Sequence, residues 1–432
     1  MPLTRLDLRG FTGGRRELRQ ALPRPTDHQD RSSAAVAAIL DEVRRGGDAA
    51  LYRLTREFDG IELDQLRVPE EEIQAALRRV PPELQDALDV AHDRILAYHA
   101  HESAGPVDDF ESGGISVRHL VRPVGRAGCY APGGRARYPS TVLMCAVPAQ
   151  VAGVDEVVLC VPPGPDGRID DASLAAAAVA GVDEVYRVGG AQAIAAMAYG
   201  TESIDPVDVI VGPGNRYVAE AKRQVSGVVG VASAFAGPSE VVVIAGPETP
   251  ADLAAIDLVV QAEHGPDGLA WLITWSEAVA EAVTAEVGRV VSASPRRDEL
   301  EATLDVGGYV VLVDGAEQAC AVANIVAPEH LELLTDSAEQ LLGRITSAGA
   351  VFVGLNSPAS VGDYLAGPNH VLPTNRSARF ASALRVDDFR RHIHAVTVTE
   401  KALEVLGPHV VTLAETEGLP AHAESVRLRW RR

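Results

Sequence analysis

The sequence has few lysines and few cysteines, and each shortage excludes a class of protein. Its only two lysines are Lys222 and Lys401. Neither of them follows a glycine-rich loop, so the phosphate-binding P-loop pattern is absent. The four cysteines are widely spaced and contain no CxxC pair, which excludes a zinc finger and a disulfide framework. We therefore expect a cytoplasmic protein with reduced thiols, in which any metal is bound by His, carboxylate or amide groups.

Long apolar runs and an excess of positive charge are also absent. No stretch approaches the roughly 18 uninterrupted apolar residues of a membrane span, and the polar, Arg-rich start of the chain predicts no secretory signal. Asp and Glu outnumber Lys and Arg by 60 to 39, a net charge of −21 that disfavours a nucleic-acid partner. The 432 residues, 47% of them hydrophobic, are typical of a soluble globular protein with several domains of about 150 residues each.

From residue 140 onward, short β-branched runs alternate with longer alanine-rich segments. The short runs are apolar almost throughout, as expected for strands that are buried on both faces. Their alternation with helical segments predicts an α/β fold with parallel sheets. The expected strands are 156–161, 184–188, 207–211, 228–232, 241–245, 269–274, 309–313 and 350–353. The expected helices are 141–152, 171–180, 192–199, 216–225, 251–262 and 277–291.

The two ends of the chain have a different pattern. Up to about residue 105 the strand signal is weak. The helices expected in this region are 32–45, 48–58, 70–79 and 82–99. Residues 111–121 are expected to form a β segment that leads to a glycine-rich loop. After Pro373 the sequence predicts a separate small tail with short helices such as 386–391 and 401–406.

Three glycine-rich turns precede expected helices, at residues 129–134 (CYAPGG), 188–192 (VGGAQ) and 211–215 (VGPGN). Backbone N–H groups at a helix N-terminus can approach an anion. Two of these turns directly follow strands, and ligands of open α/β sheets bind at the carboxyl ends of strands. Taken singly, each turn is a weak signal, and an ordinary loop is the simpler interpretation. Because GxGxxG is absent, a dinucleotide would be bound by a variant arrangement.

Four polar segments contain candidate catalytic or metal-binding residues: 261–267 (QAEHGPD), 328–332 (PEHLE), 362–370 (GDYLAGPNH) and 417–422 (EGLPAH). Gln261 and His264 stand at helix positions i and i+3, so both can face one ligand. Glu329 beside His330 offers two proton-transfer groups. Asp363, in a glycine-bounded loop, is either a metal ligand or a turn residue. For each segment alone the simpler alternative is structural, such as a helix C-terminus or a solvated helix start.

The other histidines give weaker signals. His392 and His394 stand at strand-like spacing and resemble a metal-binding pair, but no third ligand is close in sequence, so we weigh this pair against function. His92, His99 and His101 are expected to be solvated on or near a polar helix.

Taken together, the glycine-rich and polar segments resemble the histidinol dehydrogenase family. The resemblance extends in order from about Val124 to Leu428 and is faint before residue 120. The segments that carry it are GGAQAIAAMAYGTES (189–203), GPGNRYVAEAKRQV (212–225), AGPSEV (236–241), QAEHGPD (261–267), APEHLEL (327–333) and GDYLAGPNHVLPT (362–374).

The resemblance implies a zinc- and NAD-dependent oxidation of L-histidinol to L-histidine through histidinal. This is the last step of histidine biosynthesis and uses two NAD⁺ in succession. The implied zinc ligands are Gln261, His264, Asp363 and His422, and the implied catalytic pair is Glu329 and His330. The implied substrate contacts are Ser239, Gln261, His264, His330, Asp363, His370, Glu417 and His422. The implied NAD contacts are Tyr130, Gln192 and Asn215.

The resemblance also implies two Rossmann-like parallel-sheet domains, with a helical N-terminal region and a small C-terminal tail domain. The expected division is an N-terminal arm (1–25), a catalytic domain in two parts (26–128 and 240–380), an NAD-binding domain inserted between them (129–239) and a tail (381–432). The tail, which carries Glu417 and His422, is expected to reach the partner subunit of an intertwined homodimer.

Two other functions stay open on sequence alone. The nearer one is a related zinc- and NAD-dependent dehydrogenase of another alcohol, such as a sulfonated propanediol. Glu417 and His422 argue for histidinol, because an imidazole amino alcohol needs this extra pair. The other is a noncatalytic metal- or ligand-binding protein, which is disfavoured because every expected catalytic position holds a competent residue.

Overall fold

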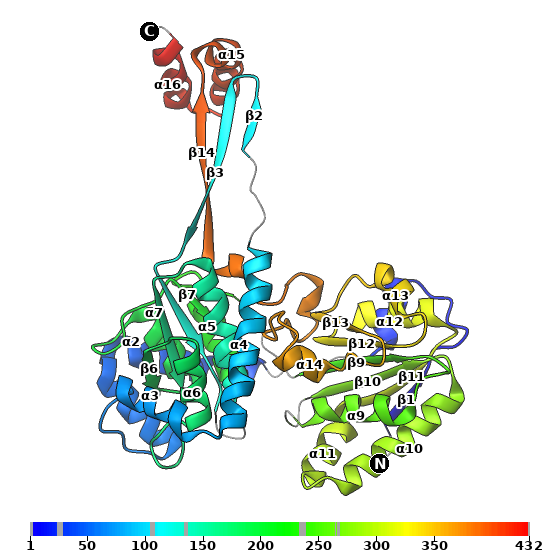
Figure 1. Cartoon of the computed structure of the whole chain (residues 1–432). Helices are drawn as coiled ribbons and strands as arrows, with labels where there is room; N and C mark the ends of the chain where they lie inside the picture. The colour runs from blue at the N-terminus through cyan, green and yellow to red at the C-terminus, as the bar shows by residue number, and fades with distance from the viewer. Residues whose placement is uncertain are drawn as a thin grey trace.

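The computed structural model describes residues 3–23, 29–103, 109–133, 137–232, 239–263, 265 and 268–430. These residues form two parallel sheets that lie side by side, and an antiparallel arm that projects away from both (Figure 1). No helix among them is both long and apolar enough to cross a membrane. The predicted α/β fold, with two parallel-sheet units, a helical N-terminal region and a small C-terminal tail, is confirmed.

In the five-stranded sheet, the first strand along the chain lies at the centre, and the later strands are added on both sides of it. Its strand order is β6-β5-β4-β7-β8, and every neighbouring pair is parallel. The strands are β4 (Arg126–Tyr130), β5 (Glu156–Val161), β6 (Glu184–Arg187), β7 (Val209–Val211) and β8 (Gly230–Val231). The connecting helices are α5 (Pro139–Ala152), α6 (Asp171–Val179), α7 (Gly190–Tyr199) and α8 (Arg216–Val225). Most residues of α5, α6 and α7 are buried, because their many alanines allow close packing.

Three N-terminal helices cover the five-stranded unit. They are α2 (Gln29–Asp59), α3 (Glu70–Arg79) and α4 (Pro82–Glu102), which pack on α7 and α8, on α6 and on α5 respectively. The two helices expected over 32–45 and 48–58 form the single element α2, which is broken at Gly47 by a left-handed φ of 53°. The Glu202 carboxylate fills the space beside this glycine and accepts the Asp48 N–H at 2.7 Å. A side chain at position 47 therefore has no room.

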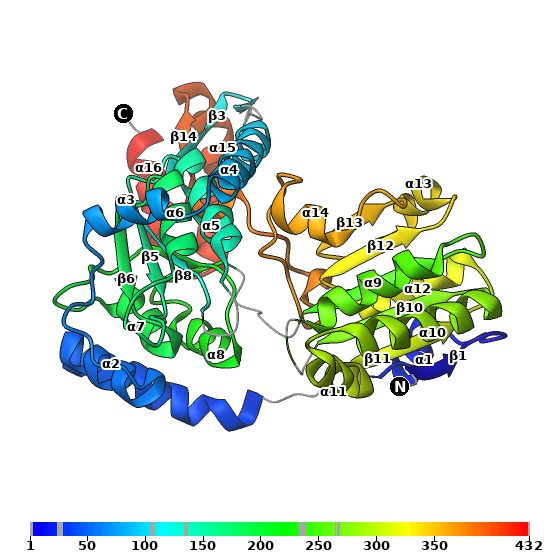
Figure 2. The same cartoon turned by 60° about the horizontal axis from the view of Figure 1, so that its bottom comes forward.

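The six-stranded sheet repeats the same pattern around β9. Its order is β1-β11-β10-β9-β12-β13, and all pairs are parallel. The strands are β1 (Thr4–Asp7), β9 (Glu240–Ala245), β10 (Leu269–Thr274), β11 (Gly308–Leu312), β12 (His330–Leu334) and β13 (Ala350–Val353). Its helices are α1 (Arg15–Ala21), α9 (Ala251–Ala262), α10 (Glu277–Ala293), α11 (Arg297–Gly307), α12 (Ala316–Val326), α13 (Ala338–Leu341) and α14 (Ala359–Tyr364). Helices α9, α10 and α11 cover one face of the sheet and α12 covers the other (Figure 2).

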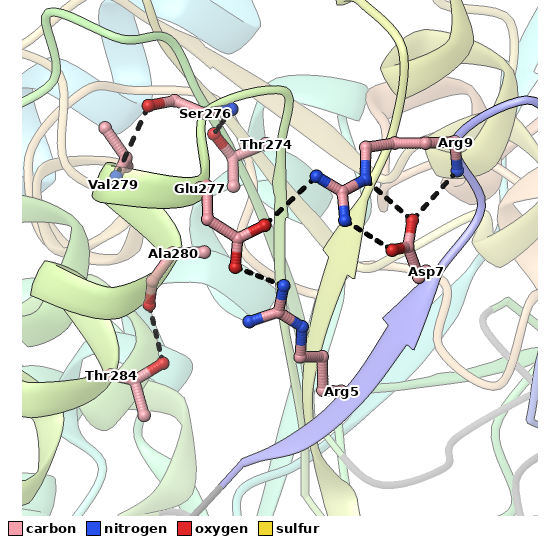
Figure 3. Close-up of polar contacts among 9 residues, drawn as sticks. All are labelled: Arg5, Asp7, Arg9, Thr274, Ser276, Glu277, Val279, Ala280 and Thr284. Carbon is pink, nitrogen blue, oxygen red and sulfur yellow. Dashed lines mark hydrogen bonds and ion pairs between the residues drawn. The ribbon is translucent and has the colours of Figure 1, made fainter.

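The N-terminal strand β1 completes one edge of this sheet by pairing with β11. Arg5 and Arg9 both form ion pairs with Glu277, in the first turn of α10, and the Arg9 contact is 3.0 Å long (Figure 3). Asp7 accepts a further hydrogen bond from Arg9 Nε at 2.9 Å. These exposed ion pairs contribute little energy, so the strand is stabilised mainly by its pairing. That pairing involves residues about three hundred positions away, which explains the weak strand signal in the sequence.

The arm combines two distant segments of the chain. Its strands β2 (Phe110–Ser112), β3 (Ile115–Pro123) and β14 (Arg390–Val398) are antiparallel, in the order β14-β3-β2. Helices α15 (Glu400–Thr416) and α16 (Pro420–Trp430) pack together at its far end (Figure 1). The prediction of a helix over 386–391 is wrong. Only a 3₁₀ turn forms there, at Val386–Phe389, and the strand β14 follows it directly. Most residues of β14 are exposed on both faces, so its sequence lacks the apolar alternation that identifies a strand.

Most other expected elements are confirmed, and six (α3, β5, α8, α9, β10 and β13) begin and end at the expected residues. The alternative of a solvated helix start at 328–332 is wrong, because His330–Leu334 is a fully buried central strand. Asp363 lies in α14 rather than in a glycine-bounded loop. His99, expected to be solvated, is fully buried beside Glu102. The division of the chain into five segments stays a prediction.

Candidate active site

A group of polar side chains lies at the amino-terminal edge of the six-stranded sheet. Glu240 and His330 begin the neighbouring parallel strands β9 and β12, where His330 lies opposite Val241. Gln261 lies in the last turn of α9, which returns the chain from the end of β9 to the start of β10. Because a crossover helix runs antiparallel to its strands, these three residues meet at one edge.

The His330 ring is buried and has polar groups on both sides. Its Nδ1 lies 2.7 Å from Gln261 Nε2, and its Nε2 lies 3.2 Å from Asp363 Oδ1. The ring also stacks on Phe352 of β13, with ring centroids 5.9 Å apart. Burial lowers the pKa of His330, but the carboxylates of Glu329 and Asp363 raise it more, so the pKa lies above its ordinary value. The ring is therefore held in one orientation, in surroundings that stabilise an added proton.

Glu329 lies beside His330 and is also buried. Its Oε2 accepts the backbone N–H of Glu240 at 3.1 Å and lies 3.6 Å from His330 Nδ1. Burial raises the pKa of Glu329 to about 7, although the neighbouring His330 lowers it. A carboxylate with this pKa is partly ionised at neutral pH and is basic enough to accept a proton from water.

Glu240 is a buried carboxyl residue of the same edge that its sequence context did not single out. Burial raises its pKa to about 8, with a further contribution from the Glu329 carboxylate. Neighbouring carboxylates disfavour double ionisation, so this pair retains a proton near neutral pH. The available signal was that Glu240 is the one charged residue in an otherwise apolar strand, where a carboxyl group is costly unless it has a role.

Asp363 lies in the last turn of α14, which packs closely on β13. A Cβ added to Gly362 would lie only 2.4 Å from Phe352 Cε1, so this contact requires glycine. The backbone carbonyl of Asp363 lies 2.8 Å from His370 Nδ1, which donates to it. Asp363 is therefore fixed through its neighbours and its backbone, with its carboxylate toward the His330 ring.

His370 also connects the two sheets. Its Nε2 lies 3.2 Å from the hydroxyl of Thr141, in the first turn of α5. Since Nδ1 donates to the Asp363 carbonyl, Nε2 of the neutral ring accepts this hydroxyl proton. Beside it, the Asn369 amide donates to the Met144 carbonyl of α5 at 2.6 Å. The amino edge of the six-stranded sheet therefore meets the carboxyl edge of the five-stranded sheet.

Gln261 offers an oxygen that fits a metal ion. Its Oε1 is buried and has no hydrogen-bond partner among the residues that the structure describes, whereas its Nε2 contacts His330. A buried carboxamide oxygen without a donor is costly, and a cation would satisfy it. Together with Asp363 it suits a cation bound without thiolate. His264 lies outside the described residues, and within the described ranges no three His, Cys, Asp or Glu side chains are grouped as a metal requires, so the zinc ligand set stays a prediction.

The predicted NAD residues lie together at the carboxyl edge of the five-stranded sheet. Tyr130 ends β4, and its hydroxyl accepts the N–H of Gly190, the first residue of α7, at 3.2 Å. Gly212 has a φ of +105° and approaches so closely that a Cβ there would lie 2.0 Å from the Tyr130 carbonyl oxygen. Gln192 is buried in α7, and Asn215 caps α8 with its side-chain oxygen. The glycine turns that precede α7 and α8 are therefore neighbours, an arrangement that suits anion binding at the helix N-termini.

The remaining predicted residues divide into two groups. Ser239 directly precedes β9 at the site edge, and its carbonyl accepts the Leu269 N–H at 3.0 Å. Glu417 ends α15 and His422 lies in α16, and both are exposed on the arm, away from α9 and α14 (Figure 1 and Figure 2). A single chain thus brings together Ser239, Gln261, Glu329, His330, Asp363 and His370, but not Glu417 or His422.

Comparisons with known proteins identify the family of this chain. The model of the family described as histidinol dehydrogenase matches residues 22–430. Histidinol dehydrogenase of Parasynechococcus marenigrum is 48% identical over 404 residues, which cover 94% of this chain and 92% of the relative. That of Thermosynechococcus vestitus is 48% identical over 424 residues, or 97% and 98% of the two chains. The crystal structure of histidinol dehydrogenase from Elizabethkingia anophelis has a TM-score of 0.93 and 35% identity, and the match covers 99% of this chain and 98% of that one. The chain therefore belongs to the histidinol dehydrogenase family, a family of NAD-dependent dehydrogenases.

Proposed function

We propose that the chain oxidises L-histidinol to L-histidine through histidinal, with two NAD⁺ used in succession and zinc bound at the amino edge of the six-stranded sheet. Family membership supports the substrate and the place in the last step of histidine biosynthesis. The observation that carries the mechanism is the His330 ring between Gln261 and Asp363, beside a Glu329 carboxyl whose pKa is about 7. One imidazole and one tuned carboxylate match the two proton transfers that the reaction needs.

His330 is assigned the first proton transfer. The hydroxyl proton of histidinol moves to the His330 imidazole while the carbinol hydride leaves for NAD⁺, which yields histidinal, NADH and one proton. Nε2 faces the Asp363 carboxylate, whereas Nδ1 faces Gln261 and Glu329 on the buried side. A proton on Nε2 is therefore stabilised by a neighbouring negative charge.

Glu329 is assigned the second proton transfer. As water adds to the aldehyde carbon of histidinal, the Glu329 carboxylate accepts one water proton and the hydrate forms as its monoanion. The hydride of the hydrate then leaves for a second NAD⁺, and loss of the remaining hydroxyl proton yields the carboxylate of histidine. An exposed glutamate is a weaker base, and the buried position of Glu329 supplies the needed basicity.

Gln261, His264, Asp363 and His422 are the proposed zinc ligands. Zinc held there would orient the amino and imidazole nitrogens of histidinol and polarise its oxygen. The unpartnered Gln261 Oε1 supports this assignment. We expect His264→Ala and Asp363→Ala to lose stoichiometric zinc, measured by metal analysis of purified protein. A variant without its four cysteines, all of which are buried, should retain zinc. The opposite pattern overturns the ligand set.

We further propose a cytoplasmic homodimer in which the arm of one subunit completes the site of the other. The four free cysteines support the location. The arm supports the dimer, because it exposes large apolar side chains such as Val396 (61% exposed) and Leu413 (64% exposed). A groove lined in part by Phe110, Ile115 and Val405 lies between the β2–β3 turn and α15. Glu417 and His422 lie on this same arm and are absent from the site of their own chain.

Mixed dimers test the exchanged arm. One variant carries Glu329→Gln and His330→Ala, and the other carries His422→Ala, and each is expected to be inactive alone. In a mixed dimer with shared sites, the intact body of the second variant meets the intact arm of the first, so one active site forms. The two chains are co-expressed with different tags and purified in tandem. Purified mixed dimers without activity would overturn the exchange and leave the zinc ligands to be decided by metal analysis.

The yield of NADH tests the activity itself. We expect two NADH per histidinol consumed, with histidine as the product, and loss of the reaction on chelation with recovery on adding zinc. One NADH per histidinol, with histidinal as the end product, would overturn the proposal.

A further inference from the structure

A second pair of acidic residues, Glu332 and Asp257, lies further along the two elements that carry His330 and Gln261. Glu332 follows His330 by two positions in β12, so both side chains emerge on the same face of the sheet. Asp257 precedes Gln261 by four positions in α9, so these two share one face of the helix. Glu332 is only 1% exposed. A second contact between β12 and α9 is thus made by two carboxyl groups, two residues further along the strand and one turn earlier in the helix.

Glu332 contacts two helices that carry site residues. Its Oε1 accepts the N–H of Ala359, the first residue of α14, at 3.0 Å. Its carboxyl group also lies beside that of Asp257 on α9. The second oxygen, Oε2, is buried and accepts no hydrogen bond from any described N–H group. One side chain therefore joins the helix that carries Asp363 to the helix that carries Gln261.

The two carboxyl groups share a proton. Burial, and then the neighbouring Asp257, raise the pKa of Glu332 to about 9. Burial also raises the pKa of Asp257, while its hydrogen bond with Glu332 lowers it. Glu332 is therefore protonated at neutral pH and donates to the Asp257 carboxylate. If both carboxyl groups were ionised, their like charges would repel each other, because little water is present to screen them.

We propose that the Glu332–Asp257 pair fixes the separation between α9 and α14. By doing so it holds Gln261 and Asp363 at opposite sides of the His330 ring. Neither acid lies at the reacting atoms, so both are positioning residues. The catalytic consequence rests on the proposed function of those site residues, whereas the contact between the helices does not. Hydrogen bonds that orient the groups around a metal typically contribute about 10- to 100-fold in metal affinity or activity.

Two replacements of Glu332 test whether its hydrogen bonds, and not only a side chain of similar size, hold the two helices in place. Glu332→Gln retains both bonds, because its carbonyl oxygen accepts the Ala359 N–H and its amide donates to Asp257. Glu332→Leu removes both bonds and leaves these groups unpaired. We expect kcat with histidinol to stay within about threefold of wild type in Glu332→Gln and to fall about 10- to 100-fold in Glu332→Leu. The KM for NAD⁺ should not change in either, since the NAD residues lie on the other sheet.

Leu258→Ala is the matched control, because it removes a buried apolar side chain next to Asp257 in the same helix without touching the pair. It should lower the melting temperature yet keep kcat at temperatures where it is folded. Hydrogen exchange of peptides covering α9 and α14 is a readout independent of activity, and it should quicken in Glu332→Leu but not in Glu332→Gln.

Three outcomes overturn the positioning role. They are an equal loss of kcat in both Glu332 variants, unchanged kcat and exchange in Glu332→Leu, and an equal loss of kcat in Leu258→Ala. A wild-type protein without histidinol oxidation, combined with the expected exchange pattern, would count against the proposed function alone.

Discussion

The five-stranded and six-stranded sheets share a strand order, but their candidate ligand residues lie at opposite edges. Apart from the N-terminal strand β1 at the edge of the larger sheet, each sheet starts at a central strand, extends over three strands to one side and then adds two strands on the other side. Tyr130 and the glycine turns lie at the carboxyl edge of the five-stranded sheet. His330 and Gln261 lie at the amino edge of the six-stranded sheet.

Helix polarity explains why the two edges differ. Connecting helices begin at a carboxyl edge, where free N–H groups and the positive end of the helix dipole suit the phosphates of a dinucleotide. They end at an amino edge, where the negative end of α9 beside Gln261 suits a cation. Two ligands of opposite charge can therefore bind between two similar sheets, provided that the sheets meet through opposite edges. The contact between His370 and Thr141 is such a meeting point.

The carboxyl edge of the six-stranded sheet has a different use. There Glu277 pairs with Arg5 and Arg9 beside the N-terminal strand (Figure 3). All three side chains are more than 40% exposed. At this part of the edge, exposed ion pairs therefore connect the N-terminal strand to α10.

The largest expected effect comes from removing the imidazole at the amino edge. His330→Asn should lower the rate of both oxidation steps by about 10²- to 10⁴-fold, the usual contribution of a proton-transfer group.

Glu329→Gln should impair the oxidation of histidinal more than that of histidinol, because only the former needs activated water. Single-turnover assays started from histidinol and from histidinal measure the two steps separately. Equal losses in both assays for Glu329→Gln would contradict this division of roles.

A matched pair of glycine substitutions tests whether the two edges act on different ligands. Gly212→Ala places a Cβ against the Tyr130 carbonyl with an unfavourable φ, and Gly362→Ala places one against Phe352. Strain of about 1–3 kcal/mol corresponds to about a 5- to 150-fold effect. We expect Gly212→Ala to raise the KM for NAD⁺ and Gly362→Ala to lower kcat and zinc content. The comparison fails if both variants change the same parameter.

The pH dependence of the second step tests the buried carboxylate. Glu329 must be ionised to accept a proton, and burial raises its pKa to about 7. As the pH falls through this value Glu329 becomes protonated, so the rate of histidinal oxidation should fall by about tenfold per pH unit below it. Steady-state rates between mildly acidic and mildly alkaline pH measure this. The Glu329→Gln variant should be slow, and its rate should not fall in this way at acidic pH. If the acidic fall in rate persists in the variant, the titrating group is another residue.

The smallest expected effect concerns the contact between the sheets. Thr141→Val removes the hydroxyl that donates to His370 Nε2, and a single hydrogen bond contributes about 0.5–1.5 kcal/mol, which is about 2- to 10-fold in rate. Thr141→Ser keeps the hydroxyl and is the control. We expect a modest fall in kcat with histidinol for the valine variant alone. Identical kinetics for wild type and both variants would show that the two edges do not depend on this contact.

Local sequence predicted the alternating region well because both periodicity and turn chemistry are local properties. Helix α8, for example, has the Asn215 cap and the apolar spacing of an amphipathic helix, and its bounds match the expectation. The strand β12 was missed because it begins at His330, directly after Glu329, and these polar groups ordinarily begin a solvated helix. Only burial against α9 and β13 makes them part of a central strand, and that burial depends on residues far along the chain.

The sequence by itself determined the alternation of strands and helices, the glycine turns, and the residue types that the proposed zinc- and NAD-dependent reaction needs. These follow from local backbone preferences and from side-chain chemistry, which neighbouring residues express directly. Only the tertiary structure decided that the two sheets meet through opposite edges, that Glu240 lies beside Glu329 and that Glu332 contacts both Ala359 and Asp257. It also placed Glu417 and His422 on a distant arm. Such placements depend on which strands pair and which helices cover them, and the free energy of that packing comes from contacts between segments that are remote in sequence.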